Sequence, residues 1–119
     1  MSPWILVASL LGAAGVLLGA FGAHGLEQRV GADRLASWST AVDYHLIHAL
    51  ALLALGLFSA ATDRSVTLPA SLFVGGIVLF SGSIYGLVLG APSWLGPITP
   101  LGGLCLIAGW LSLFFVARS

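Results

Sequence analysis

The sequence predicts an all-α membrane protein in which four transmembrane helices form a bundle. Of its 119 residues, 59% are hydrophobic and only 7% are charged, against about 25% charged residues in an ordinary soluble protein. The mean hydropathy is +1.09. A small soluble domain needs a charged shell, and this chain lacks the residues to form one. The composition therefore excludes a soluble globular domain, a disordered chain and a basic nucleic-acid-binding protein.

The lengths of the apolar stretches predict the number of spans. A bilayer core of about 30 Å requires about 20 apolar residues in a helix. Pro3 suits a first helical turn, and the uncharged stretch 65–117 is divided by the breaker-rich run 91–97. We expect a single transmembrane domain over residues 1–119 with both termini on one side. Its predicted spans are residues 3–23, 42–62, 68–90 and 98–117.

The one long connection, residues 24–43, predicts a helical segment of its own. Asp33 is a residue type that caps helix starts, and a mostly apolar stripe follows at spacings of three and four: Leu35, Trp38, Val42, His45, Ala49 and Leu52. We expect a helix from about Asp33 that lies in or near the interface and bends or runs straight into the second span. Trp38 would anchor it at headgroup depth. An aromatic belt is predicted at the span ends, at Trp4, Trp94 and Trp110.

Glycine predicts how the helices pack. Sixteen residues are glycine, and helices in lipid associate through small residues that let backbones approach closely. We expect Gly15 with Gly19 in the first span, and Gly82 with Gly86 in the third, to form packing ridges. The same ridges favour a homo-oligomer, because a bundle of this size leaves several faces free.

Polar residues gather in one leaflet, on the side of connection 24–43, which we call side B. A polar residue at membrane depth is costly and faces the bundle interior, a cavity or a partner. Tyr44 and His48 are four residues apart and share a helix face, as do Ser81 and Tyr85. The predicted polar network or ligand-binding site consists of His24, Asp43, Tyr44, His48, Ser81, Tyr85 and Thr99.

Four roles for this polar layer stay open at this point. It fixes packing through interhelical hydrogen bonds, or forms a pocket for a small or lipidic ligand. A third role is a zinc site of His24, His45 and His48, although few carboxylates lie near to complete it. The fourth is a proton path through Asp43 and His48. No enzymatic motif is present, and no cofactor is predicted. Cys105 is the single cysteine, which excludes an intrachain disulfide.

Five strings together resemble a known family: GAFGAHGL at 19–26, WSTAVDYHLIHAL at 38–50, LFSGSIY at 79–85, ITPLGG at 98–103 and GW at 109–110. They are similar to the small bacterial inner-membrane family called domain of unknown function 423, related to a small eukaryotic transmembrane protein. The resemblance implies four transmembrane helices and a basic, cytoplasmic C-terminus, represented here by Arg118. Both termini would then be cytoplasmic and side B periplasmic. It implies no established activity, substrate or cofactor.

Residues of the predicted layer lie inside these strings: His24, Tyr44, His48, Ser81, Tyr85 and Thr99. His45 is the less characteristic histidine of the pair. We therefore expect an inner-membrane, homo-oligomeric bundle whose polar layer fixes packing or binds a small or lipidic ligand. The alternatives are a small transporter or channel, an accessory subunit of a larger membrane complex, and a metal-dependent enzyme. The expected partners are the lipid bilayer, further copies of the chain and an unidentified membrane protein, with no nucleic acid.

Overall fold

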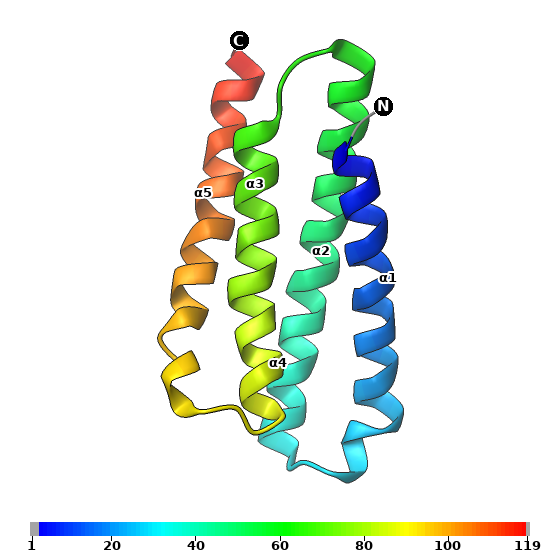
Figure 1. The fold of residues 1–119 in the computed structure, drawn as a ribbon, viewed down its shortest axis with the longest axis vertical. Coiled ribbons are helices and arrows are strands. Elements are labelled where there is room, and N and C mark those ends of the chain that lie inside the picture. Colours follow the sequence, from blue (N-terminus) through cyan, green and yellow to red (C-terminus); the bar gives the residue numbers. More distant parts are fainter. Residues whose placement is uncertain (1–2, 119) are drawn as a thin grey trace.

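Four apolar helical segments run up and down along the long axis of the molecule (Figure 1). The computed structural model describes residues 3–118 and measures 48 × 26 × 17 Å. Within that range, four segments are long and apolar enough to cross a membrane: Pro3–Gln28, Ala32–Thr62, Thr67–Val88 and Ser93–Arg118. This confirms the predicted all-α membrane fold. Pro3 and Arg118 lie at the end of the bundle opposite the connection between the first two spans.

The spans are built from five α-helices and three short helical turns: α1 Pro3–His24, η1 Leu26–Gln28, α2 Ala32–Thr62, α3 Thr67–Gly76, η2 Ile77–Ser81, α4 Gly82–Val88, η3 Ser93–Leu95 and α5 Ile98–Arg118. The third span is continuous through α3, η2 and α4. The connection after α2 is short because Asp63 adopts a left-handed conformation, with φ of 59°, and its N–H closes the helix on the Ser59 carbonyl.

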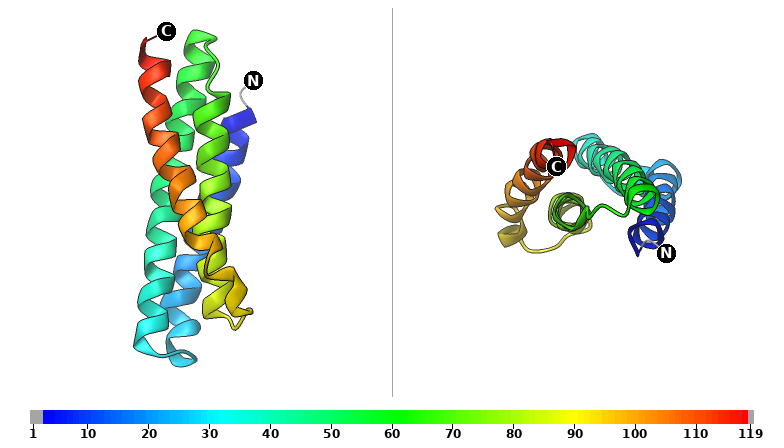
Figure 2. Two further views of the ribbon diagram at one scale, coloured as in Figure 1. Left: turned by 90° about the vertical axis from the view of Figure 1, so that its left-hand side faces the viewer. Right: turned by 90° about the horizontal axis from the view of Figure 1, so that it is seen from above.

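The helices form two tightly packed pairs. α1 packs mainly on α2, and α5 packs on α3 and η2. Viewed along the bundle, α1 and α5 lie at opposite edges, with α2 and the third span between them (Figure 2). The two pairs meet where α2 contacts α3, η2 and α4, so the contacts across this boundary hold the halves together.

α2 is one uninterrupted helix that begins at Ala32 and enters the second span without a break. The prediction that Asp33 caps it is wrong: the N-cap is Gly31, whose backbone is extended, and Asp33 lies in the first turn. The prediction that Trp38 anchors the helix at headgroup depth is also wrong. Its side chain is only 1% exposed, because Gly22 of α1 leaves room for the indole: a Cβ there would lie 2.6 Å from the Trp38 ring.

Glycines in α1 make room for its close contact with α2. A Cβ on Gly15 would lie 2.5 Å from Leu46 Cδ2, and one on Gly19 would lie 3.3 Å from Val42 Cγ1. Both residues therefore lie in the helix contact where the sequence puts them, and α1 approaches α2 closely along this ridge.

The contact between the third and fourth spans uses glycines that the sequence analysis missed. A Cβ on Gly102 would lie 2.2 Å from the Phe80 backbone nitrogen, and one on Gly76 would lie 2.3 Å from Leu106 Cδ2. Of the predicted pair, Gly86 faces Leu95, where a Cβ would come within 3.0 Å. Gly82 is exposed, and a Cβ there would meet nothing within 4 Å. Gly82 therefore does not serve as a packing residue among residues 3–118.

The third span contains a π-helical turn, η2, that the sequence analysis also missed. The N–H of Gly82 bonds to the carbonyl of Ile77, five residues earlier, so the turn is wider than in an α-helix. Ser81, at the end of the turn, is fully buried, and its hydroxyl donates to the Ala41 carbonyl of α2 at 2.7 Å. The wide turn lies where α2, the third span and α5 come together.

Candidate functional site

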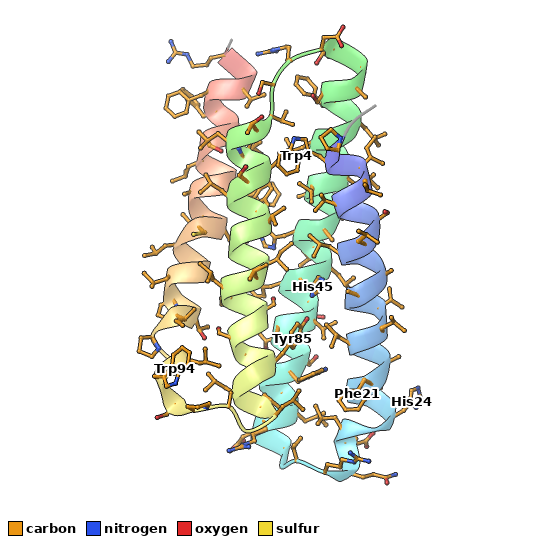
Figure 3. All side chains as sticks on the ribbon, in the orientation of Figure 1. Trp4, Phe21, His24, His45, Tyr85 and Trp94 are labelled. Atoms are coloured by element: carbon orange, nitrogen blue, oxygen red, sulfur yellow. The ribbon has the colours of Figure 1, made fainter. Side chains whose placement is uncertain are left out.

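His45 joins three spans through one buried ring. Its Nε2 lies 2.8 Å from the Leu11 carbonyl oxygen of α1, and its Nδ1 lies 2.9 Å from the Tyr85 hydroxyl of α4. A carbonyl only accepts, so Nε2–H donates to Leu11 and Nδ1 accepts from the Tyr85 O–H. The imidazole is 3% exposed, and both of its nitrogens are bonded within the protein. Figure 3 shows His45 and Tyr85 between the helices.

His48 makes the corresponding link to the fourth span with the opposite tautomer. Its Nδ1 donates to the Tyr44 carbonyl at 2.7 Å, and its Nε2 accepts from the indole N–H of Trp110 at 2.9 Å. The His48 ring also lies against Phe73, with ring centroids 5.5 Å apart. Trp110 is near the middle of α5 and is bonded to a core histidine, so its predicted place in a belt at the span end is wrong.

Other polar side chains of the layer are bonded in separate pairs. The Ser83 and Thr99 hydroxyls lie 2.5 Å apart and join α4 to the start of α5. The Trp38 indole N–H donates to the Leu18 carbonyl of α1 at 2.9 Å. The buried polar groups are therefore small interhelical clamps rather than one connected network.

The predicted polar residues divide into two groups. His48, Ser81, Tyr85 and Thr99 each make an interhelical side-chain hydrogen bond. Tyr44 is 44% exposed and stacks its ring on His48, whereas Asp43 is exposed on α2. His24 is exposed at the end of α1 and points away from the bundle (Figure 3).

The histidines do not converge. No group of three or more His, Cys, Asp or Glu side chains suited to a metal ion occurs within residues 3–118. His24 is separated from the other two, and the acceptor nitrogens of His45 and His48 already receive hydrogen bonds from Tyr85 and Trp110. The residues His24, His45 and His48 thus do not fit a zinc site in this fold.

Three residues that hydrogen-bond in this layer were not part of the predicted network: His45, the buried Trp38 and the partly exposed Trp110. A signal for His45 was available, because it lies on the same apolar stripe as Val42, Ala49 and Leu52, all of which are buried. The sequence places His48 in the side B half of the membrane. In the structure, His48 lies near the middle of α2, which runs from Ala32 to Thr62 without a break.

A groove of about 530 Å³ opens between α2, α4 and the connection that leads to α5. Its polar lining is formed by Arg34, Ser37, Thr40, Ser93 and Thr99, and its apolar wall includes Ile84, Leu87 and Val88. Arg34 Nη1 donates to the Val88 carbonyl at 3.4 Å, which directs the guanidinium toward the end of α4. The groove thus combines a cation with hydroxyl groups and an apolar wall, on side B.

Deleting the Tyr85 hydroxyl tests whether its hydrogen bond to His45 stabilises the fold. In Tyr85→Phe, His45 Nδ1 loses its donor in a buried position, and we expect the free energy of unfolding to fall by about 1 kcal/mol, within the measured range for interhelical hydrogen bonds. The matched control is Tyr44→Phe, because no hydrogen bond of the Tyr44 hydroxyl occurs within residues 3–118. Reversible unfolding in mixed micelles measures both. Equal stability of the two variants would contradict the clamp.

Comparison with known proteins places the chain among membrane proteins without an assigned function. Residues 18–103 match the model of a family described as "Protein of unknown function (DUF423)". A "UPF0382 membrane protein" of Staphylococcus saprophyticus is 43% identical over 95% of this chain and 94% of its own length. The Bacillus subtilis UPF0382 membrane protein YwdK is 41% identical over 98% of this chain and 97% of its own length.

A relative also occurs in a eukaryote: the Schizosaccharomyces pombe UPF0382 membrane protein C1782.12c is 43% identical over 90% of this chain and 94% of its own length. No solved structure matches the chain. The family match covers most of the sequence, and the relatives match over nearly their full length. The chain is therefore a membrane protein that belongs to the DUF423 family, as its sequence motifs predict.

Proposed function

We propose that the protein is a membrane-embedded binding protein for an anionic amphiphile, a molecule with a phosphate or carboxylate head and an apolar chain. The observation that carries this proposal is the side B groove, which sets Arg34 beside an apolar wall. A guanidinium binds phosphate or carboxylate through paired N–H donors. The head would lie beside Arg34 and Ser93, and the apolar chain against Ile84 and Leu87.

The buried polar layer has a different proposed role, which is to fix packing. Both ring nitrogens of His45 and of His48 are bonded inside the protein, so they have no remaining capacity for a ligand. Clamps of this kind hold α1, α2 and the third and fourth spans in one arrangement. A fixed arrangement gives the groove a constant shape.

Membrane location and assembly complete the proposal. We place the protein in the bacterial inner membrane, as a homo-oligomer with both termini cytoplasmic and side B periplasmic. Relatives in Staphylococcus and Bacillus support the bacterial membrane. The transporter, channel and accessory-subunit alternatives stay predictions.

The proposed binding role of the groove is tested by removing the positive charge of Arg34. In Arg34→Gln, we expect binding of phosphatidylglycerol in detergent micelles to weaken about tenfold or more, since a hydrogen bond to a charged group contributes about 1.5–3 kcal/mol. The matched control is Arg29→Gln, because Arg29 is exposed on the same side of the bundle but does not line the groove. Titration of each protein with lipid measures the dissociation constant.

Two further ligands identify what is recognised. Diacylglycerol carries the same chains without the phosphate and should bind weakly to all three proteins. Inorganic phosphate carries the charge without the chains; binding as tight as that of the lipid would make free phosphate the ligand. Equal binding of phosphatidylglycerol by the wild type and Arg34→Gln would contradict the proposal.

A further inference from the structure

The polar side chains of the side B groove differ in the hydrogen-bonding groups that they offer to a ligand. The groove is lined by one guanidinium and four hydroxyls: Arg34, Ser37, Thr40, Ser93 and Thr99. A hydroxyl has one proton to donate and two lone pairs that accept. A hydroxyl that donates to a carbonyl of its own chain therefore presents only an acceptor to the groove.

Two hydroxyls of α2 have their protons engaged in this way. Ser37 Oγ donates to the Asp33 carbonyl at 3.2 Å, and Thr40 Oγ1 donates to the Ala36 carbonyl at 3.1 Å. Both are bonds to the preceding turn, a common arrangement for serine and threonine in helices. Both residues are exposed and line the groove, so each offers its lone pairs there.

Thr99 of α5 reaches the same state through Ser83. Ser83 Oγ donates to the Phe80 carbonyl at 3.0 Å, which uses its only proton. The Thr99 hydroxyl, 2.5 Å from Ser83 Oγ, is therefore the donor of the bond between them. Three of the four hydroxyls in the groove, from two different helices, thus present acceptors only.

The donors of the groove belong to Arg34 and Ser93. Arg34 gives one N–H to the Val88 carbonyl, and a guanidinium has five. The Ser93 hydroxyl makes no hydrogen bond with any residue from 3 to 118. No Asp or Glu of the described part of the chain lines the groove. The groove therefore provides donors for an anionic group and, separately, acceptors for a ligand that carries donors of its own.

We infer that the head bound in the groove is a phosphodiester whose alcohol carries free hydroxyl groups, as the glycerol of phosphatidylglycerol does. The inference rests on the proposed function and specifies its ligand. The phosphate accepts from Arg34, while the hydroxyls of the alcohol donate to Ser37 and Thr40. An ammonium group would also donate, but it would lie near the guanidinium with no carboxylate to balance the two charges. A hydroxyl carries no such cost.

Lipids that differ only in the head test this specificity. Phosphatidylmethanol has the same chains and the same phosphodiester charge but no hydroxyl, and phosphatidylethanolamine has an ammonium in its place. We expect the wild type in detergent micelles to bind phosphatidylglycerol about fivefold more tightly than either lipid, the gain of about one neutral hydrogen bond. Binding of phosphatidylmethanol or phosphatidylethanolamine as tight as that of phosphatidylglycerol would overturn the inference. Equally tight binding of glycerol phosphate, which lacks the chains, would overturn a lipid as the source of the head.

Variants of the acceptor hydroxyls connect the specificity to the groove. In the double variant Ser37→Ala/Thr40→Val, we expect binding of phosphatidylglycerol to weaken about fivefold and binding of phosphatidylmethanol to change much less. Ser39→Ala removes another exposed hydroxyl of α2 that does not line the groove, and should leave the preference for phosphatidylglycerol intact. Equal weakening of both lipids by the double variant would contradict the inference, since it would mean that the shape of the groove had changed.

The Arg34→Gln variant separates this inference from the proposed function on which it rests. We expect Arg34→Gln to weaken phosphatidylglycerol and phosphatidylmethanol by the same factor, because both carry the phosphate. Unchanged binding of both lipids in Arg34→Gln would overturn the proposed function and this inference together. Weakening of both by Arg34→Gln, with no preference between them in the wild type, would leave the proposed function standing and overturn the hydroxyl-bearing head alone.

Discussion

Replacing Gly102 with alanine is expected to lower the free energy of unfolding by about 3 kcal/mol, the upper part of the usual range for overpacking. The added Cβ would lie 2.2 Å from the backbone nitrogen of Phe80 and 2.6 Å from the carbonyl carbon of Leu79. These neighbours are backbone atoms of the π-helical turn, so no side chain can rotate away. α5 and the third span must move apart, which also weakens the bond between Trp110 and His48.

The neighbouring glycine provides the control for this variant. A Cβ on Gly103 would lie 3.7 Å from Phe80 Cδ1, an ordinary contact, so Gly103→Ala should change stability by less than about 0.5 kcal/mol. Reversible unfolding in mixed micelles compares the two on one scale. Similar stabilities for Gly102→Ala and Gly103→Ala would mean that α5 does not approach the third span as described.

The Trp38→Ala variant is expected to lose about 3–5 kcal/mol of stability, the usual cost of deleting a buried large aromatic side chain. Trp38 is 1% exposed, its ring lies 4.7 Å from that of Tyr85, and its N–H donates to the Leu18 carbonyl. Removing it leaves a cavity at the junction of α1, α2 and α4. It also leaves the Leu18 carbonyl without its side-chain donor.

Two companion variants separate volume from hydrogen bonding. Trp38→Phe keeps most of the ring and should cost only about 1–2 kcal/mol, from the lost hydrogen bond and the smaller ring. Trp94→Ala, in which a 66% exposed indole is removed, should leave stability close to that of the wild type. If Trp38→Ala were as stable as Trp94→Ala in mixed micelles, Trp38 would be an interfacial anchor, as the sequence suggests, and not a core residue.

The fold could be predicted because it depends on quantities that are local in the sequence. The length of each apolar stretch, the breakers at 91–97 and the near absence of charge determine the number of spans. The first residue of α2 was harder to predict from the sequence. Gly31 and Asp33 are both acceptable N-cap types, and the choice between them depends on how the chain leaves α1.

The candidate site was only partly predictable because its bonds join residues far apart in the chain. The stripe through Val42, His45 and Ala49 shows that His45 is buried, but its partner Tyr85 is forty residues away. Tryptophans near span ends usually mark the interface. Trp38 and Trp110 are exceptions because each N–H finds an acceptor inside the bundle. The packing role of Gly102 depends on the π-helical turn opposite it, for which the sequence offers no clear signal.

The groove could not be predicted from the sequence, because the residues that line it are far apart in the chain. Arg34 lies in the first turn of α2, whereas Ser93 and Thr99 lie at the start of the fourth span. Only the meeting of α2 with the end of α4 brings these side chains together. Thr99 is the one residue of the predicted polar layer that lines the groove.

The central claim is that the ligand site is the groove, while the buried polar layer serves the fold. Native mass spectrometry of the protein released from bacterial membranes in mild detergent tests this most directly, with the wild type beside Arg34→Gln and Tyr85→Phe. We predict that a bound anionic lipid is retained by the wild type and by Tyr85→Phe but is lost from Arg34→Gln. Retention by Arg34→Gln with loss from Tyr85→Phe would contradict the claim and move the ligand site into the polar layer.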